Sequence, residues 1–265
     1  MEKNVTNAIV NDKSSLTDQK LYLCVIMPAY NEEAHIYENL LQTSAIISEF
    51  VKKYQIIVVN DGSSDNTLGK ISEACDMDHH IGCLTHSANK GKGYSIKKGV
   101  MYAEAEYIAF LDSDLELSPT MLRYFLKALQ ATDADIAIGS KMHPQSKLDY
   151  PLSRRIMSTG YYMILKLLFH MSIHDTQTGI KLFKAPVIKS ICQELDTNGY
   201  AFDIEILATA TLEGCKIIEL PVELEYKRDR KEKSRFTLKT INRIFLDTIR
   251  IKKRLNKRKK NKKKE

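Results

Sequence analysis

Short apolar runs alternate with longer stretches of helical periodicity through the first half of the chain. The runs predicted to be strands are 21–27, 55–60, 81–85, 107–111 and 136–140. The stretches predicted to be helices are 32–53, 65–76, 91–105 and 119–131. Strands that alternate with helices in this way are typical of a wound α/β sheet, so we expect a Rossmann-like mixed sheet flanked by helices.

The second half of the chain has a less regular pattern. Residues 154–171 predict a long and rather apolar helix, which contains Arg154, Arg155, Lys166 and His170. These charges favour a place in the core or at an interface over a membrane span, which needs roughly 18 or more apolar residues. Shorter elements are predicted at 179–183, 185–195, 201–213 and 216–225.

The C-terminal segment has the clearest amphipathic pattern. Over 237–255, one helical arc collects Leu238, Ile241, Ile244, Phe245, Ile249, Ile251 and Leu255, with Lys252 as the violation. Residues 257–264 are then almost entirely Lys, Arg and Asn. Two interpretations stay open: a helix docked on the body with a solvated tail, or a helix lying in a membrane interface with its basic run held by anionic lipid.

Charge separates this segment from the rest of the chain. Residues 227–265 hold 19 Lys and Arg against 4 Asp and Glu, a net +15, which leaves −8 for residues 1–226 although the whole chain is +7. An acidic body and a tail without interleaved aromatic residues argue against a nucleic-acid partner. The five cysteines form no C-x-x-C pair, which favours free thiols in a reducing cytoplasm.

Polar loops follow successive predicted strands: 27–33, 60–67, 89–93 and Asp112-Ser113-Asp114. In a wound sheet these loops meet at one edge. If the chain turns there, Asp112 and Asp114 can hold a hard divalent cation, and such a cation can bind a diphosphate. The alternative is a turn in which both aspartates cap backbone amides.

Four further motifs follow in the second half of the chain: Asp175-Thr176-Gln177-Thr178-Gly179-Ile180-Lys181-Leu182-Phe183, Ala201-Phe202-Asp203-Ile204-Glu205, Glu219-Leu220-Pro221-Val222 and Ser234-Arg235-Phe236. Together with the strand-end loops, these motifs resemble the family 2 glycosyltransferases. Those enzymes have the GT-A fold. The resemblance covers about residues 21–235 and is nearest to the dolichyl- and undecaprenyl-phosphate sugar synthases. It implies a transferase domain over 21–235. The polar, mixed-charge residues 1–20 predict a disordered leader, and residues 236–265 predict an amphipathic basic helix and tail.

The resemblance also assigns roles to single residues. Those matched to nucleotide-sugar binding are Pro28, Ala29, Tyr30, Glu32, Asp61, Asp112, Ser113 and Lys141. Asp112 and Asp114 match a pair that binds Mg²⁺ or Mn²⁺, and Asp114, Asp175 and Asp203 are the candidate catalytic residues. Arg155 and Arg235 are the candidates for the acceptor phosphate. For Lys90 and Lys92 two interpretations stay open, added positive charge near the aspartate pair or solvated side chains, and we expect solvation.

The activity implied is inverting, metal-dependent transfer of one hexose from a nucleotide sugar, with UDP-glucose favoured, to a polyprenyl phosphate. The enzyme would be cytoplasmic and peripheral on the inner membrane face, held to anionic lipid by its tail. The alternative acceptor is a hydroxyl of a cell-wall, capsular or other glycan. It would need Asp175 or Asp203 as a base, whereas a lipid phosphate is already anionic and leaves Asp175 to position the sugar or lysine partners. The chain has no Trp, so the Gln-x-x-Arg-Trp motif of polymer-forming relatives is absent.

Overall fold

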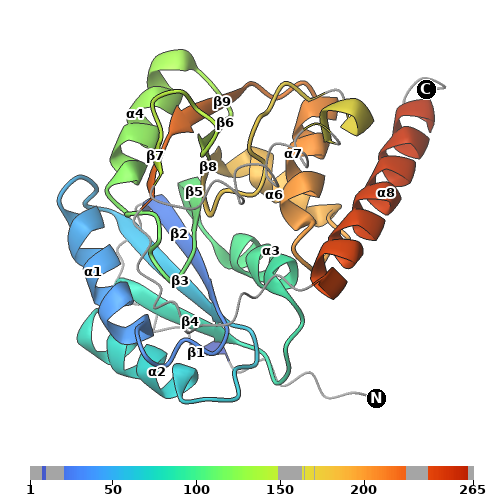
Figure 1. Ribbon diagram of the computed structural model, residues 1–265. Helices are drawn as coiled ribbons and strands as arrows, with labels where there is room; N and C mark the ends of the chain where they lie inside the picture. The colour runs from blue at the N-terminus through green and yellow to red at the C-terminus, as the bar shows by residue number, and fades with distance from the viewer. Residues whose placement is uncertain are drawn as a thin grey trace.

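The computed structural model describes residues 8–9, 21–148, 163, 165–169, 171–224 and 238–261. Its main sheet has the strand order β1-β4-β3-β2-β5-β8-β6-β9 (Figure 1). The strands are β1 (Ala8–Ile9), β2 (Leu21–Ala29), β3 (Tyr54–Asn60), β4 (Ile81–Thr85), β5 (Ala105–Leu111), β6 (Ile136–Ser140), β8 (Ile180–Lys184) and β9 (Ile217–Pro221). A small second sheet pairs β7 (Lys147–Leu148) with β10 (Glu223–Leu224). The wound mixed sheet predicted from the alternating pattern is therefore confirmed.

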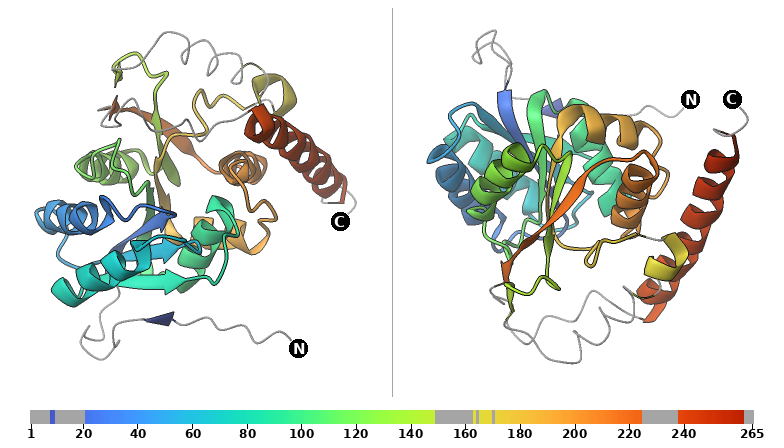
Figure 2. Two further views of the ribbon diagram at one scale, coloured as in Figure 1. Left: turned by 60° about the horizontal axis from the view of Figure 1, so that its bottom comes forward. Right: turned by 90° about the horizontal axis from the view of Figure 1, so that it is seen from above.

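Helices cover both faces of the sheet (Figures 1 and 2). The helices are α1 (Ile36–Ser48), α2 (Thr67–Met77), α3 (Lys92–Tyr102), α4 (Met121–Thr132), α6 (Ala185–Gln193), α7 (Phe202–Leu212) and α8 (Leu238–Asn261). Side chains alternate along β2, so that Cys24 and Ile26 join the core under α3, α6 and α7, while Val25 and Met27 join the core under α1, α2 and α4. This alternation produces three layers with two separate cores.

The strand ends that lead into the candidate site loops lie at one edge of the sheet. Strands β2, β3, β4 and β5 are parallel, so their carboxyl ends lie together. Strand β8 runs antiparallel between β5 and β6, and its first residue, Ile180, pairs with Leu111 at the end of β5. The segment before β8 is thereby brought next to Asp112.

Most predicted elements are present with shifted ends. Helix α1 begins at Ile36 rather than at residue 32, because residues 30–35 form a loop tied to the next strand end. Helix α8 continues to Asn261, beyond the predicted end at Leu255. Within the predicted helix over 154–171, residue 163 and residues 165–169 are helical, and the rest lies outside the described residues. The five cysteines form no disulfide. No helix among the described residues is long and apolar enough to cross a lipid bilayer.

Helix α8 packs against α7, as both figures show (Figures 1 and 2). Its buried face consists of Ile244, Thr248, Ile251 and Leu255, which recur at helical spacing, and the three apolar residues join the adjacent core. Docking on the body, one of the two interpretations of this amphipathic segment, is thus observed.

Candidate active site

The first two strand-end loops are joined to each other by hydrogen bonds. The amide of Asp61 donates to the carbonyl of Ala29 at 2.9 Å, and the amide of Glu32 donates to Oγ1 of Thr67 at 2.8 Å. The amide of Asn31, which has a φ of 54°, donates to Oγ of Ser63 at 3.0 Å. These bonds fix the predicted nucleotide loop, Pro28 to Glu32, against the end of β3, with the Tyr30 side chain exposed.

Asp61 organises the glycine-rich loop before α3. Its side chain is buried, and its two carboxylate oxygens accept the amides of Lys90 and Gly91, each at 2.8 Å. Gly62 has a φ of 67°, and a Cβ there would lie 2.3 Å from the carbonyl carbon of Ala88, so only glycine fits between the two loops. Carboxylate oxygens have further lone pairs, so binding of a nucleoside by Asp61 stays a prediction compatible with this geometry.

The chain turns immediately after β5, as a shared ligand for the paired aspartates requires. Leu115 has a φ of 49°, and its amide donates to the carbonyl of Asp112 at 3.3 Å. Oδ1 of Asp114 accepts the amide of Glu116 at 3.3 Å, so capping of a backbone amide, the alternative for this motif, is observed for Asp114. Ser113 is buried, whereas Asp112 and Asp114 are partly exposed. The aspartates therefore occupy a turn that leaves carboxylate surface accessible.

Lys92 neutralises Asp112. Its Nζ lies 2.5 Å from Oδ1 of Asp112, although the two residues come from different loops. Burial works against the charged ammonium, but the charges of Asp112 and Asp203 outweigh it and raise the pKa of Lys92. The expectation that Lys92 is solvated is wrong, because the fold places it against a carboxylate. Lys90 instead places its ammonium 4.8 Å from the centre of the Tyr94 ring.

Asp203, at the start of α7, forms a buried ion pair. Nζ of Lys181 lies 2.7 Å from its Oδ1 and donates to the carbonyl of Thr178 at 2.6 Å. Burial raises the pKa of the Asp203 carboxyl, and Lys181 and Lys92 offset part of that rise. Asp203 therefore interacts with Lys92, the same lysine that pairs with Asp112. Its catalytic role stays a prediction.

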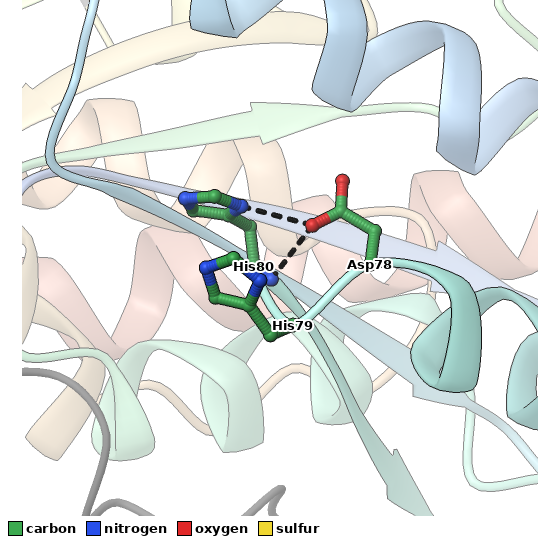
Figure 3. A group of neighbouring side chains, drawn as sticks. All are labelled: Asp78, His79 and His80. Carbon is green, nitrogen blue, oxygen red and sulfur yellow. Dashed lines mark hydrogen bonds and ion pairs between the residues drawn. The ribbon is translucent and has the colours of Figure 1, made fainter.

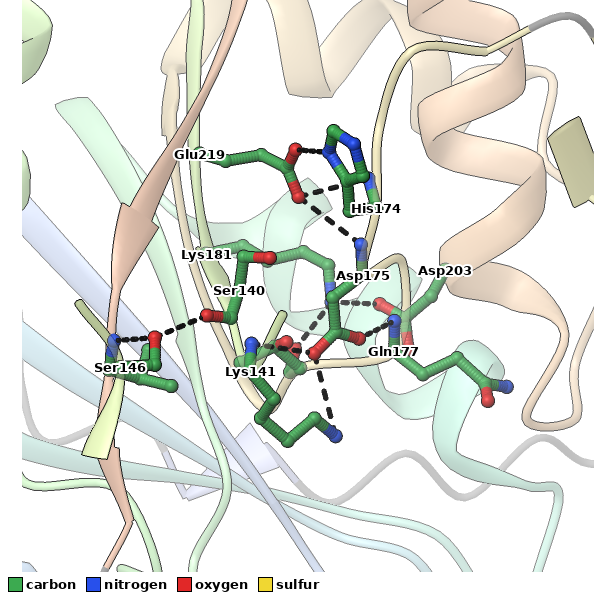
Figure 4. Close-up of polar contacts among 11 residues, drawn as sticks. Ser140, Lys141, Ser146, His174, Asp175, Gln177, Lys181, Asp203 and Glu219 are labelled. Carbon is green, nitrogen blue, oxygen red and sulfur yellow. Dashed lines mark hydrogen bonds and ion pairs between the residues drawn. The ribbon is translucent and has the colours of Figure 1, made fainter. Parts of the chain in front are cut away.

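Asp175 lies among Lys141, Gln177, Lys181 and Asp203 (Figure 4). Its Oδ2 accepts the amide of Lys141 at 2.9 Å and lies 3.7 Å from Nζ of that lysine, while Oδ1 accepts the amide of Gln177 at 3.2 Å. The carboxylate thus fixes the end of β6 against the segment that leads to Gly179. Its contact with a lysine fits the positioning role that we considered for Asp175.

Glu219 of β9 holds the backbone of the segment that contains Asp175. Its carboxylate accepts the amides of His174 at 3.0 Å and of Asp175 at 3.2 Å, and lies 2.6 Å from Nδ1 of His174. The sequence motifs contain Glu219 but not its pairing with His174. Residues this far apart in sequence give no local signal of such a contact, so sequence reasoning missed it.

A different cluster of potential metal ligands, Asp78, His79 and His80, lies just before β4 (Figure 3). It is therefore at the amino end of that strand, whereas the candidate active site is at the carboxyl ends of the strands. Oδ1 of Asp78 accepts both the amide and, at 2.9 Å, Nδ1 of His80, and its other oxygen accepts the hydroxyl of Ser44. The His80 ring stacks on Tyr54 with 4.3 Å between centroids. These contacts explain the cluster as the turn that joins α2 to β4.

The structure brings together the predicted site residues around Asp61 and Asp112 at the strand ends. Residues 175–179 connect this group to a second one, which contains Asp175 and Lys141. The methylene of Gly179 lies directly against the Asp112 carboxylate: a Cβ there would be 2.5 Å from Oδ2. Arg155 and Arg235, the candidates for the acceptor phosphate, lie outside the described residues. Their role is untested.

Known proteins match this chain over most of its length. The sequence model of the family described as glycosyl transferase family 2 matches residues 24–192. Dolichyl-phosphate beta-glucosyltransferase of Saccharomyces cerevisiae is 27% identical over 237 residues, with 82% of this chain and 71% of that protein covered. The protein of the same name from Drosophila melanogaster is 31% identical over 223 residues, with 78% and 67% covered.

A solved structure resembles the whole body. Glucosyl-3-phosphoglycerate synthase from Mycobacterium tuberculosis, in complex with Mn²⁺, uridine-diphosphate and glucosyl-3-phosphoglycerate, gives a TM-score of 0.65 at 17% identity, with 87% of this chain and 78% of that chain covered. At this identity the likeness concerns the fold, and it confirms the predicted GT-A fold. With more than half of its length matched by the family model, the chain belongs to glycosyl transferase family 2.

Proposed function

We propose that this protein transfers a single glucose from UDP-glucose to a polyprenyl phosphate, with inversion at the anomeric carbon. The observation that carries the proposal is the match of about four-fifths of the chain to dolichyl-phosphate beta-glucosyltransferases. A beta product from an alpha-linked donor requires inversion. The partly exposed Asp112-Asp114 turn supplies a site suited to a nucleoside diphosphate at the sheet edge where such folds bind nucleotides.

The residues present fit a divalent cation at Asp112 and Asp114. Carboxylate oxygens are the ligands that Mg²⁺ and Mn²⁺ prefer. Both carboxylates are partly exposed, and Oδ1 of Asp112 contacts the ammonium of Lys92, which a bound cation would replace at that oxygen. A bound cation would stabilise the negative charge of the departing diphosphate.

The other loops supply binding and orientation. Pro28 to Glu32 and Asp61 form the floor against which the nucleoside would lie, and the bonds among these loops hold that floor rigid before substrate arrives. Lys92, which contacts Asp112, would add a positive charge beside a diphosphate bound at this turn. Lys141, held by Asp175, would supply a positive charge to the acceptor phosphate.

No general base is required in this proposal. A polyprenyl phosphate is anionic near neutral pH and can attack the anomeric carbon directly, opposite the leaving diphosphate. Both oxygens of Asp175 accept backbone amides and Oδ2 lies 3.7 Å from Nζ of Lys141, so its contacts are those of a group that positions its neighbours. A hydroxyl acceptor would instead require a carboxylate free to take a proton.

The helix α8 offers a surface for an anionic membrane. Its docking face is buried, but Phe245 and Leu246 stay 43% and 55% exposed. Leu167, 77% exposed, belongs to the short helical segment next to α8, where Nζ of Lys252 lies 5.5 Å from the centre of the Phe169 ring. Lys253, Lys257, Lys259 and Lys260 follow these apolar side chains along α8. Each lysine near an anionic surface contributes on the order of 1 kcal/mol. We infer a peripheral location on the cytoplasmic face, with residues 236–265 as the membrane-binding unit attached to the transferase domain.

Vesicle flotation tests this surface. The double variant F245S/L246S is expected to lose most binding to phosphatidylserine vesicles, because the apolar contribution disappears while the charges remain. Met77→Ser is the matched control, since Met77 is an apolar side chain and, at 69%, even more exposed, but lies on α2, on the other face of the sheet. Equal flotation of F245S/L246S and the wild type, or flotation with uncharged vesicles, would contradict the membrane proposal.

The proposed reaction is tested by transfer of radioactive sugar from a panel of nucleotide sugars into lipid that is extractable with organic solvent. We expect incorporation from UDP-glucose when polyprenyl phosphate is present and none with the corresponding polyprenol. Label that appears instead in a water-soluble glycan would favour the hydroxyl acceptor. No transfer to either acceptor would refute the proposed function.

A further inference from the structure

An arginine of helix α8 reaches the part of the chain that supports the candidate site. Arg254 makes ion pairs with Glu205 in α7 and with Asp196 in the loop after α6. Its neighbours on the helix, Ile251 and Leu255, are buried against the body. Arg254 therefore lies in a packed interface, with about a quarter of its side chain exposed.

Glu205 is the central group of this contact. Its side chain is 1% exposed, and its two oxygens accept the amides of Asp196 at 3.1 Å and Thr197 at 2.9 Å. A buried carboxylate needs a charge partner, because an uncompensated charge in the interior is strongly unfavourable. Arg254 supplies that partner, and by bridging Glu205 and Asp196 it fixes the loop over residues 194–199.

The 194–199 loop in turn caps the first turn of α3. The carbonyl of Asn198 accepts the amides of Gly93 at 2.8 Å and Tyr94 at 3.3 Å, and Nζ of Lys97 donates to the carbonyl of Leu195 at 2.8 Å. The approach is close: a Cβ on Gly93 would lie 2.5 Å from the carbonyl oxygen of Thr197. Movement of the loop would therefore move the start of α3.

The start of α3 is part of the candidate nucleotide site. The amides of Lys90 and Gly91 hold the Asp61 carboxylate, and Lys92 neutralises Asp112. A continuous series of hydrogen bonds and ion pairs thus runs from α8, through Glu205 and the 194–199 loop, to both predicted nucleotide-binding carboxylates. The family model matches residues 24–192, so the whole α8 end of this connection lies beyond the matched segment.

We propose that Arg254 is a positioning residue for the nucleotide sugar. It touches no substrate, and it acts by holding the 194–199 loop, which sets the positions of Lys92 and of the amides that bind Asp61. The inference rests on the proposed function in one respect, namely that the loops around Asp61 and Asp112 bind the nucleotide. If Arg254 instead only anchored α8, its loss would lower stability without changing the site.

The test uses the full chain with Arg254→Gln and Arg254→Lys. The matched control is Arg250→Gln, because Arg250 lies one turn earlier on α8 and pairs at the surface with Asp247 of its own helix. Binding of UDP in the presence of Mn²⁺ is measured by calorimetry, and amide hydrogen exchange is measured across the glycine-rich loop and the 194–199 loop. These two measurements distinguish a change at the nucleotide site from a loss of overall stability.

We expect Arg254→Gln to weaken UDP binding roughly tenfold and to speed exchange at the amides of Gly93 and Thr197. Arg254→Lys should fall between the variant and the wild type, because a lysine keeps the charge but cannot bridge two carboxylates with a planar fork. In steady-state assays the loss should appear in the KM for the donor more than in kcat. Arg250→Gln should behave as the wild type does.

A folded Arg254→Gln protein with wild-type UDP affinity and wild-type exchange at Gly93 overturns the proposal. If that variant does not fold, Arg254→Lys and Asp196→Asn, which removes only the exposed half of the bridge, decide the question by the same criteria. A wild-type protein that binds no UDP contradicts the proposed function instead, and the exchange at Gly93 then still decides whether Arg254 holds the loop.

Discussion

Adding one methyl group at Gly179 tests whether the Asp112 carboxylate must stay where it is. An ideal Cβ at Gly179 would lie 2.5 Å from Oδ2 and 2.8 Å from Cγ of Asp112. Comfortable contacts between such atoms are roughly 3.5 Å, so the carboxylate has to move by about 1 Å. Gly179 does not have a positive φ in the left-handed region, so alanine is compatible with its backbone.

This displacement is expected to slow transfer strongly. Moving the carboxylate breaks its 2.5 Å contact with Lys92 and changes its position relative to Asp114. A misplacement of about 1 Å in an active site costs on the order of 100-fold in rate, equivalent to about 3 kcal/mol. We therefore predict that Gly179→Ala lowers the rate by about that factor and raises the Mn²⁺ concentration needed for half-maximal activity.

The assay is the initial rate of glucose transfer to polyprenyl phosphate over a series of Mn²⁺ concentrations, with thermal melting as the check on folding. Gly82→Ala is the control, because a Cβ at Gly82 would meet its nearest atom, Nε2 of Gln55, at an ordinary 3.7 Å. If Gly179→Ala folds and keeps the wild-type rate and the wild-type Mn²⁺ dependence, the position of the Asp112 carboxylate does not govern transfer and the reasoning is refuted.

Three further predictions concern the acceptor of the reaction, the buried ion pair of Lys181 with Asp203, and the loss of stability at acid pH. Asp175→Asn should retain measurable transfer to polyprenyl phosphate, because no base is needed; complete loss of turnover in a folded variant would favour a hydroxyl acceptor. Lys181→Met should lower the free energy of unfolding by about 3–5 kcal/mol in denaturant titrations, because it leaves Asp203 buried without its partner, and K181M/D203L should recover part of that loss. Burial alone would raise the pKa of Asp78, but hydrogen bonds from Ser44 and His80 outweigh it and lower the pKa. The stability from the charged form is therefore present above the ordinary aspartate pKa of about 3.9 and is lost as the pH falls through the folded-state value, so Asp78→Asn should flatten the decline in unfolding free energy at acid pH.

The strands were predictable because their signal is local. Side chains of β2 alternate between two cores, and the predicted strands over 81–85 and 136–140 match β4 and β6. Helix ends were less predictable. Helix α1 begins late because the amide of Glu32 bonds to Thr67, a contact between residues 35 positions apart. Helix α8 ends late because lysine and arginine are good helix formers, a signal that was present in the sequence.

The candidate site shows the same division. Its strand-end loops could be assembled from the order of elements, since parallel strands place their carboxyl ends together. The pairing of Lys92 with Asp112, and of Lys181 with Asp203, depends on how α3 and α7 pack on the sheet. Isolated lysines are common on protein surfaces, so the sequence favoured solvation for Lys92, and it gave no indication of a partner for Lys181. Only the fold reveals that both are bound to carboxylates.

The central claim is that the carboxylates of Asp112 and Asp114 hold a cation that the transfer reaction requires. The most direct measurement is glucose transfer by the double variant D112N/D114N, which keeps the size of both side chains, with Mn²⁺ and separately with a chelator. We expect no detectable transfer by the folded variant under either condition, and we expect the wild type to lose activity in chelator and to regain it with Mn²⁺. Normal turnover by the folded variant in chelator would show that transfer does not require a cation at these carboxylates.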